Sequence, residues 1–160
     1  MCNISLDFDI HLFHEEYNHP FYIGGVKLEH HSGAFGHSDA DVLLHAICDA
    51  LLGAANLRDI GFHFKNTDDR WKGVSSLVLL EETVKLLKEK GWAIGNIDAM
   101  LCLEEPKITP HVPEMKRNIA LAGGISEDDI SIKATTNETM GFVGREEGVV
   151  AYAVCLIEKI

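Results

Sequence analysis

The chain has 160 residues, of which 46% are hydrophobic and 24% charged, and its formal net charge is −11. This length predicts one domain over residues 1–160 with a substantial core. The composition excludes disordered, collagen-like and low-complexity chains. The negative charge argues against nucleic acid or an anionic membrane as a partner. No apolar run of about 18 residues is present, so no membrane-spanning helix is expected.

The cysteines and the N-terminus bear on the cellular compartment. Cys2, Cys48, Cys102 and Cys155 form no Cys-x-x-Cys pair, which predicts free thiols in a reducing compartment. No basic and then apolar signal segment is visible at the N-terminus. We therefore expect a cytoplasmic protein, or a plastid protein if a transit peptide has been removed.

Hydrophobic periodicity predicts eight elements in the order β-β-α-α-β-α-β-β. The expected strands cover 4–12, 21–29 (with a bend at Gly24-Gly25), 97–103, 130–136 and 149–157, and the expected helices cover 38–55, 76–90 and 113–122. The run at 149–157 is almost continuously apolar, which is typical of a central strand. This succession predicts an α+β fold, a two-layer sandwich of a mixed β-sheet with helices on one face.

The start of the first predicted helix has two features of interest. Ser38 and Asp41 match a capping box, so the helix is expected to begin at about Ser38. Free N–H groups at such a helix start attract anions, which makes His37-Ser38 a candidate phosphate contact.

Three residues suggest a metal site. Asp9 and His11 project from the same face of the first strand, because they are two residues apart. His45 lies in the middle of an otherwise apolar helix and would complete an Asp/His/His set with an open fourth position, as in catalytic zinc sites. Asp41 and Asp49, one turn either side of His45, could orient it or contact a substrate. The alternatives remain a surface Asp–His pair, a hydrogen-bonded core histidine and an acidic helix edge.

A second polar segment suits phosphate. Lys133-Ala134-Thr135-Thr136-Asn137-Glu138 leaves a predicted strand and leads to Gly141-Phe142-Val143-Gly144-Arg145. Hydroxyl, lysine and arginine groups bind oxyanions, and Glu138 could hold a hard divalent ion. The alternative is an ordinary polar hairpin loop. The sequence contains no phosphate-binding P-loop, no dinucleotide-binding glycine pattern and no serine-hydrolase elbow.

Taken in order, these motifs resemble the 2-C-methyl-D-erythritol 2,4-cyclodiphosphate synthase family of the non-mevalonate isoprenoid pathway. The similar segments are Asp9-Ile10-His11, Gly36–Val42, His45-Ala46, Asp49–Ala54, Asp59–Gly61, Phe64, Thr67-Asp68, Pro106-Lys107, Pro110-His111, Lys133–Thr136, Glu138, Gly141-Phe142 and Gly144-Arg145. The similarity covers essentially the whole chain. Where the family often has Gly-Arg-Gly-Glu-Gly, this chain has Gly144-Arg145-Glu146-Glu147-Gly148, which adds an acidic side chain.

The resemblance implies an intramolecular phosphoryl transfer. The 2-phosphate of 4-diphosphocytidyl-2-C-methyl-D-erythritol 2-phosphate attacks the β-phosphorus, CMP leaves, and the 2,4-cyclodiphosphate forms, which makes the enzyme a phosphorus–oxygen lyase. The resemblance also implies a homotrimer with active sites between subunits. Each subunit is expected to hold one zinc ion through Asp9, His11 and His45, and Glu138 to hold magnesium or manganese with the substrate.

The resemblance assigns the remaining site residues by position. His37 and Thr136 are the expected catalytic residues. Expected contacts to the substrate are Ser38, Asp59, Ile60, Gly61, Phe64, Lys65, Asn66, Thr67, Asp68, Phe142 and Arg145. The expected cytidine pocket consists of Leu103, Glu104, Glu105, Pro106, Lys107, Ile108 and Thr109 together with Thr135.

Two other hypotheses are compatible with the same residues. One is a zinc-dependent phosphoesterase that acts on a nucleotide diphosphate substrate with water as the nucleophile. The sequence shows no second cluster of carboxylate and histidine ligands that would build a closely spaced two-metal site for it. The other is a trimeric regulatory protein that binds prenyl diphosphate without turnover.

Overall fold

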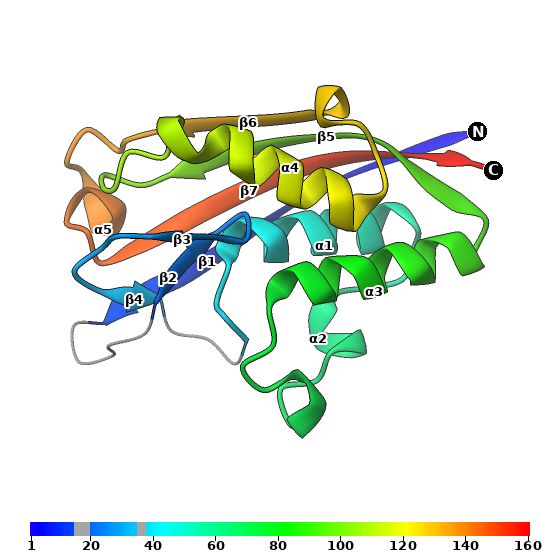
Figure 1. Ribbon diagram of the computed structural model, residues 1–160, viewed down its shortest axis with the longest axis horizontal. Helices are drawn as coiled ribbons and strands as arrows, with labels where there is room; N and C mark the ends of the chain where they lie inside the picture. The colour runs from blue at the N-terminus through cyan, green and yellow to red at the C-terminus, as the bar shows by residue number, and fades with distance from the viewer. Residues whose placement is uncertain (15–19, 35–37) are drawn as a thin grey trace.

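The computed structural model describes residues 1–14, 20–34 and 38–160 (Figure 1). Five strands form one sheet in the order β4-β1-β7-β5-β6. They are β1 (Cys2–His14), β4 (Gly33–Ala34), β5 (Trp92–Cys102), β6 (Ile130–Thr135) and β7 (Gly148–Lys159). β5 and β6 are parallel, and the other neighbours are antiparallel. The predicted mixed sheet and the central position of the last strand are therefore confirmed.

Residues 21–29 form a separate two-stranded hairpin of β2 (Phe21–Ile23) and β3 (Val26–Leu28). The turn at Gly24-Gly25 has φ values of 59° and 72°. Glycine adopts this left-handed region without the steric penalty of a Cβ atom, which explains the bend expected there.

Three helices lie on one face of the sheet (Figure 1): α1 (Val42–Ala54), α3 (Ser76–Glu89) and α4 (Val112–Gly123). α1 is buried on nearly all sides between β1, β7 and α3. The segments expected to be irregular also contain the short helices α2 (Ile60–His63) and α5 (Gly141–Gly144). Single 3₁₀ turns occur at Asp69–Trp71, Thr109–His111 and Glu127–Asp129. The result is the predicted mixed α+β arrangement.

The predicted start of the first helix was wrong by four residues. Asp41, not Ser38, is the N-cap of α1, and its carboxylate accepts the Leu44 N–H at 3.1 Å. Ala40, directly before it, has a φ of 56°, so the chain is not helical there. The Asp41 carboxylate also accepts the N–H groups of Gly24 and Gly25 at 3.0 and 2.7 Å. A carboxylate thus already occupies the helix start that was expected to attract phosphate.

The face of the sheet opposite the helices carries a row of exposed apolar side chains. In β1 these are Ile4, Leu6, Phe8, Ile10 and Leu12, each between 49% and 66% exposed. Tyr152 of β7 pairs with Phe8 and is also exposed. We call these six residues the open sheet face. The alternate residues of β1, including Asp9 and His11, consequently point toward the helices.

Among the helices of the described residues, none is both long and apolar enough to cross a membrane. All four cysteines are free thiols, as expected, with Cys48 and Cys155 buried.

Candidate metal centre

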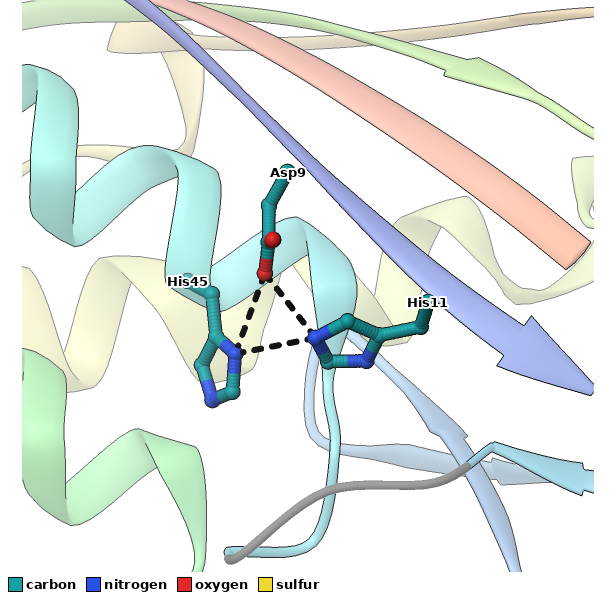
Figure 2. Close-up of side chains that lie close together, drawn as sticks. All are labelled: Asp9, His11 and His45. Atoms are coloured by element: carbon teal, nitrogen blue, oxygen red, sulfur yellow. Dashed lines mark hydrogen bonds and ion pairs between the residues drawn. The ribbon is translucent and has the colours of Figure 1, made fainter. Parts of the chain in front are cut away.

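Asp9, His11 and His45 come together between the sheet and the helix layer (Figure 2). Asp9 and His11 extend from β1, and His45 extends from α1, which packs on that strand. The Asp9 Oδ2 atom lies 2.9 Å from His11 Nε2 and 3.2 Å from His45 Nδ1. The two ring nitrogens are 3.3 Å apart. Three potential ligand atoms therefore point at one small volume.

The opposite nitrogen of the His11 ring fixes its tautomer. His11 Nδ1 lies 2.7 Å from the Ala40 carbonyl oxygen. A carbonyl only accepts hydrogen bonds, so Nδ1 carries a hydrogen and donates it. In the neutral ring, the lone pair is then on Nε2, the atom that faces Asp9 and His45. This is the usual arrangement of a histidine that binds a metal.

His45 is oriented in the same way by serine hydroxyl groups. Its Nε2 atom lies 3.0 Å from the hydroxyl oxygens of both Ser38 and Ser76. The Ser76 hydroxyl donates to the Asp39 carboxylate, so it accepts the hydrogen of His45 Nε2. The lone pair of the neutral ring is then on Nδ1, directed at Asp9 and His11.

Burial would raise the pKa of the Asp9 carboxyl, but hydrogen bonds from His11 and His45 outweigh it and hold that pKa below its ordinary value. Burial would likewise lower the pKa of His11, but its hydrogen bond to Asp9 raises the pKa instead. Asp9 is therefore a carboxylate that draws positive charge to the cluster. Without a metal, a proton on His11 Nε2 supplies that charge and is donated to Asp9; a divalent cation can replace this proton and bind the freed lone pair.

The spacing of the three ligand atoms fits a small tetrahedral metal ion. Bonds of about 2.0–2.2 Å imply ligand atoms about 3.3–3.6 Å apart in a tetrahedral site, close to the 2.9–3.3 Å observed here. One carboxylate and two imidazoles are typical zinc ligands, and three protein ligands leave one position open for an exchangeable group. The donor set thus fits the zinc site expected from the sequence.

A cavity of about 380 Å³ adjoins the metal cluster. Its lining residues are Ser38, His45, Ile60, Gly61, Phe64, Asn66, Trp71 and Leu79. Five of them (Ser38, Ile60, Gly61, Phe64 and Asn66) are among the expected substrate contacts. A cavity of this size is in the range of small-molecule sites, so the candidate metal lies at the wall of a space that can hold a ligand.

The other expected substrate contacts in the segment 59–68 do not line the cavity, and two of them cap short helical turns beside it. Asp59 caps α2 by accepting the Phe62 N–H at 2.9 Å. Asp68 caps the following 3₁₀ turn and accepts a bidentate pair from the exposed Arg70 guanidinium. Lys65 and Thr67 are exposed between these two turns.

Among the described residues, neither the Asp41 nor the Asp49 carboxylate bonds to the His45 ring, contrary to one of the sequence interpretations; Asp41 and His45 share only a helical backbone hydrogen bond. Asp49 instead accepts the N–H of Ile60, the first residue of α2, at 2.6 Å. It thereby attaches the cavity wall to α1. Burial raises the pKa of Asp49 to about 6, with further contributions from Asp7 and Asp59, while the Ile60 N–H opposes the rise.

The pKa of Asp49 predicts a change in stability with pH. Because its folded pKa lies above the ordinary 3.8, the folded state binds more protons between about pH 4 and 6, and stability falls as pH rises through this window. In metal-free protein, the unfolding free energy of Asp49→Asn minus that of wild type should increase by about 1–2 kcal/mol from pH 4 to pH 7.5, after a discount for partial exposure. Urea denaturation at both pH values measures this. The same difference in unfolding free energy between Asp49→Asn and wild type at both pH values would contradict this prediction. Asp128→Asn, at an exposed turn, is the control.

A second group of expected site residues meets at the ends of β5 and β6. The Thr136 hydroxyl donates to Glu138 Oε1 at 3.2 Å. Glu104 Oε1 accepts the backbone N–H groups of Asn137 and Thr139. The Leu103 N–H donates to the Thr135 carbonyl at 3.1 Å. These bonds place the expected cytidine segment beside Thr136 and Glu138.

Within the expected cytidine segment, Leu103 and Ile108 are buried, while Glu105, Lys107 and Thr109 are exposed. Pro106 lies between them in a turn after β5. Lys107 Nζ approaches the Glu104 carbonyl at 3.4 Å. Further along the chain, Phe142 is partly exposed in α5, and the Arg145 guanidinium forms a bidentate pair with Glu147.

The structure does not join these two groups within one subunit. α2 and the segment from β6 to α5 lie in different parts of the molecule (Figure 1). Over residues 1–14, 20–34 and 38–160, no hydrogen bond or ion pair connects the metal cluster with Thr136 or Glu138. His37, an expected catalytic residue, lies outside the described residues.

Sequence reasoning missed Ser76 as the partner of His45 and Asp39 as the partner of Ser76. Ser76 lies 31 residues from the histidine that it contacts, so no local pattern joins the two. Only the packing of α3 against α1 brings the two together. Trp71 and Leu79 of the cavity wall were missed for the same reason.

Comparison with known proteins agrees with this architecture. The model of the YgbB family matches residues 2–158. The 2-C-methyl-D-erythritol 2,4-cyclodiphosphate synthase of Cytophaga hutchinsonii is 59% identical over 156 residues, 98% of this chain and 97% of that protein. The bifunctional IspDF from Campylobacter jejuni has a TM-score of 0.94 at 36% identity, over 100% of this chain and 43% of that one. A Plasmodium falciparum IspF solved as a CDP complex has a TM-score of 0.86 at 29% identity, over 99% of this chain and 96% of that one.

Proposed function

The chain belongs to the YgbB family, and we propose that it converts 4-diphosphocytidyl-2-C-methyl-D-erythritol 2-phosphate to 2-C-methyl-D-erythritol 2,4-cyclodiphosphate with release of CMP. An oxygen of the 2-phosphate forms a bond to the β-phosphorus, and the bond from that phosphorus to the oxygen bridging to the α-phosphate breaks. CMP leaves with the bridging oxygen, and no water is consumed. The observation that carries the proposal is the convergence of Asp9, His11 and His45 beside a ligand-sized cavity.

This reaction needs positioning and charge neutralisation more than covalent help from the protein. Asp9, His11 and His45 would hold zinc, and a zinc ion bound there would act as a Lewis acid on phosphate oxygens. Ser76 and Ala40 keep the two imidazole rings in the tautomers that leave their inner nitrogens free. The cavity between α1 and α2 would enclose the methylerythritol part.

The second group of residues would bind the nucleotide end. Thr136 and Glu138 lie side by side, so a hydroxyl donor to phosphate and a carboxylate ligand for magnesium or manganese would act at one place. The neighbouring residues 103–109 and Thr135 would contact cytidine. The CDP complex of the Plasmodium falciparum relative supports a cytidine nucleotide as the ligand.

Two observations support a homotrimer with sites between subunits. The open sheet face exposes six large apolar side chains in the single chain, and such patches mark interfaces. The two halves of the proposed site also lie apart within one subunit, so a neighbouring copy has to supply the missing half. Closed symmetric assembly would satisfy both requirements at once.

The product distinguishes this activity from hydrolysis. Purified protein with zinc, magnesium and the diphosphocytidyl substrate should give CMP and a cyclic diphosphate, seen as two coupled phosphorus signals by ³¹P NMR. CMP with the open 2,4-bisphosphate, whose two phosphorus signals are not coupled to each other, would instead indicate the phosphoesterase. The membership of the family and the cyclodiphosphate synthase relatives favour cyclisation.

Glu138→Gln should weaken the dependence on added magnesium. The substitution keeps the shape of the side chain but removes the charge that a hard cation requires. We expect the magnesium concentration for half-maximal rate to rise by at least about 10-fold, which corresponds to about 1.4 kcal/mol of binding. A magnesium titration of initial rates measures this. Glu89→Gln on the exposed end of α3 is the control, and an unchanged titration for Glu138→Gln would refute the role.

For its location we propose the cytoplasm of a bacterium, because the free thiols suit a reducing compartment and the relative that is 59% identical comes from the bacterium Cytophaga hutchinsonii.

A further inference from the structure

A second cluster of possible metal ligands lies apart from the proposed active site. It consists of His30 and His31, between β3 and β4, and Glu146, in the turn between α5 and β7. One ligand atom from each residue lies within 4.8 Å of the others. No sequence pattern indicates this cluster, because 115 residues separate His31 from Glu146. It shares no residue with the first cluster, so it is not half of a bridged two-metal site.

His30 is oriented as a metal ligand would be. Its Nδ1 atom lies 2.7 Å from the Ser32 carbonyl oxygen, which can only accept a hydrogen bond. The Ser32 N–H also lies 3.2 Å from Nδ1 and could only donate to it; the shorter bond to the carbonyl favours the tautomer with the hydrogen on Nδ1 and the lone pair on Nε2. That atom is buried and has no hydrogen-bond partner in the part of the chain that the structure describes. Aromatic contacts with Phe13 and Phe21 hold the ring in place. A buried nitrogen lone pair without a partner is costly unless something binds it.

His31 and Glu146 supply the other two ligand atoms of the cluster. The two histidine rings are 4.2 Å apart between centroids. His31 Nε2 lies 3.9 Å from Glu146 Oε2, at the outer limit of an ion pair. The backbone fixes this proximity, since Phe13 pairs with Ala34 of β4 and its N–H donates to the Glu147 carbonyl at 2.9 Å. β4 and α5 are accordingly found at the same end of the molecule (Figure 1).

We propose that His30, His31 and Glu146 form a second site for a divalent transition-metal ion of the zinc type. Two imidazoles and one carboxylate are the ligands preferred by zinc and its neighbours, and not by magnesium or calcium. A bare His31–Glu146 ion pair would leave His30 Nε2 without a partner, whereas a metal ion uses all three groups. His31 and Glu146 are exposed enough to move the short distance that coordination requires.

The second site depends on a glutamate that the resembling family often lacks, and it is independent of the proposed catalysis. Glu146 is the acidic side chain that stands where the resembling family often has glycine. Its φ of 55° is in the region that glycine favours, so the glutamate is held at a position where its side chain carries a conformational cost. A bound ion would tie the segment between β3 and β4 to the turn between α5 and β7.

Zinc stoichiometry tests the site without reference to activity. Metal-free protein is dialysed against buffered Zn²⁺ at about micromolar free concentration, and bound zinc is counted by elemental analysis. We expect two zinc ions per subunit in the wild type. Glu146→Gln and His31→Asn should each bind one fewer, while Glu127→Gln, at an exposed turn, should bind as many as the wild type.

Cobalt(II) gives a second readout in the His45→Ala background, where the first site is disabled. Tetrahedral coordination produces visible absorption bands, which should persist in His45→Ala and disappear when Glu146→Gln is added. Equal zinc content in wild type, His31→Asn and Glu146→Gln would overturn the second site. Because these variants leave Asp9, His11 and His45 intact, that outcome would not affect the proposed function.

Discussion

His45→Ala should lose one zinc ion per subunit and nearly all cyclising activity. His45 supplies one of three inner ligands, and its Nδ1 atom lies 3.2 Å from Asp9 and 3.3 Å from His11. Loss of an outer partner of a metal ligand costs about 10–100-fold in affinity or activity, so loss of the ligand itself should cost more than about 100-fold. Elemental analysis and the rate of CMP release measure the two effects.

Ser76→Ala provides a graded comparison for His45→Ala. It removes the hydroxyl that accepts the His45 Nε2 hydrogen but leaves all three ligands in place. We expect an intermediate loss of about 10–100-fold in zinc affinity. His111→Ala, a histidine before α4 outside the cluster, should leave zinc content unchanged. Wild-type zinc content in His45→Ala would show that His45 is not a ligand.

Phe8→Asp should dissociate the proposed trimer and abolish activity. Phe8 lies in the middle of the open sheet face and is 56% exposed in the single chain. In an assembly that covers this face, the new carboxylate would be buried without a partner, which is strongly unfavourable. Size-exclusion chromatography with light scattering should show a trimer of the 17.7 kDa chain for the wild type and a monomer for the variant. Activity should fall by more than about 100-fold, because each site would lose the half supplied by its neighbour.

Leu121→Asp is the matched control for Phe8→Asp. Leu121 is 84% exposed but lies on α4, on the helical side of the sheet. Its replacement should leave both assembly and activity close to wild type. A trimer that survives Phe8→Asp would mean that another surface holds the subunits together.

The sequence alone predicts the framework well where its signals are local. The two-residue spacing of Asp9 and His11 predicts that they share one face of β1, and this is confirmed; the apolar residues alternate with them on the other face. The apolar run of β7 correctly indicates the central strand. Periodicity does not say which face of β1 the helices cover. Here the helices cover the face with the metal ligands, and the more apolar face is left open.

Prediction from the sequence fails where a feature depends on contacts between residues that are far apart in the chain. The start of α1 depends on Gly24 and Gly25, whose N–H groups bind the Asp41 carboxylate from a hairpin 16 residues or more away. The short helices α2 and α5 have no periodic pattern because each has only four residues. The hydroxyl that orients His45 comes from another helix. Such features follow from tertiary packing, which no local pattern encodes.

The most direct test of the central claim is the fate of water oxygen during turnover. The reaction is run in H₂¹⁸O with the diphosphocytidyl substrate, and the masses of CMP and of the diphosphate product are measured. Intramolecular attack by the 2-phosphate consumes no water, so both products should remain unlabelled and the diphosphate should have the mass of the cyclic form. One ¹⁸O atom in either product, together with the mass of the open 2,4-bisphosphate, would show that water is the nucleophile and would contradict cyclisation.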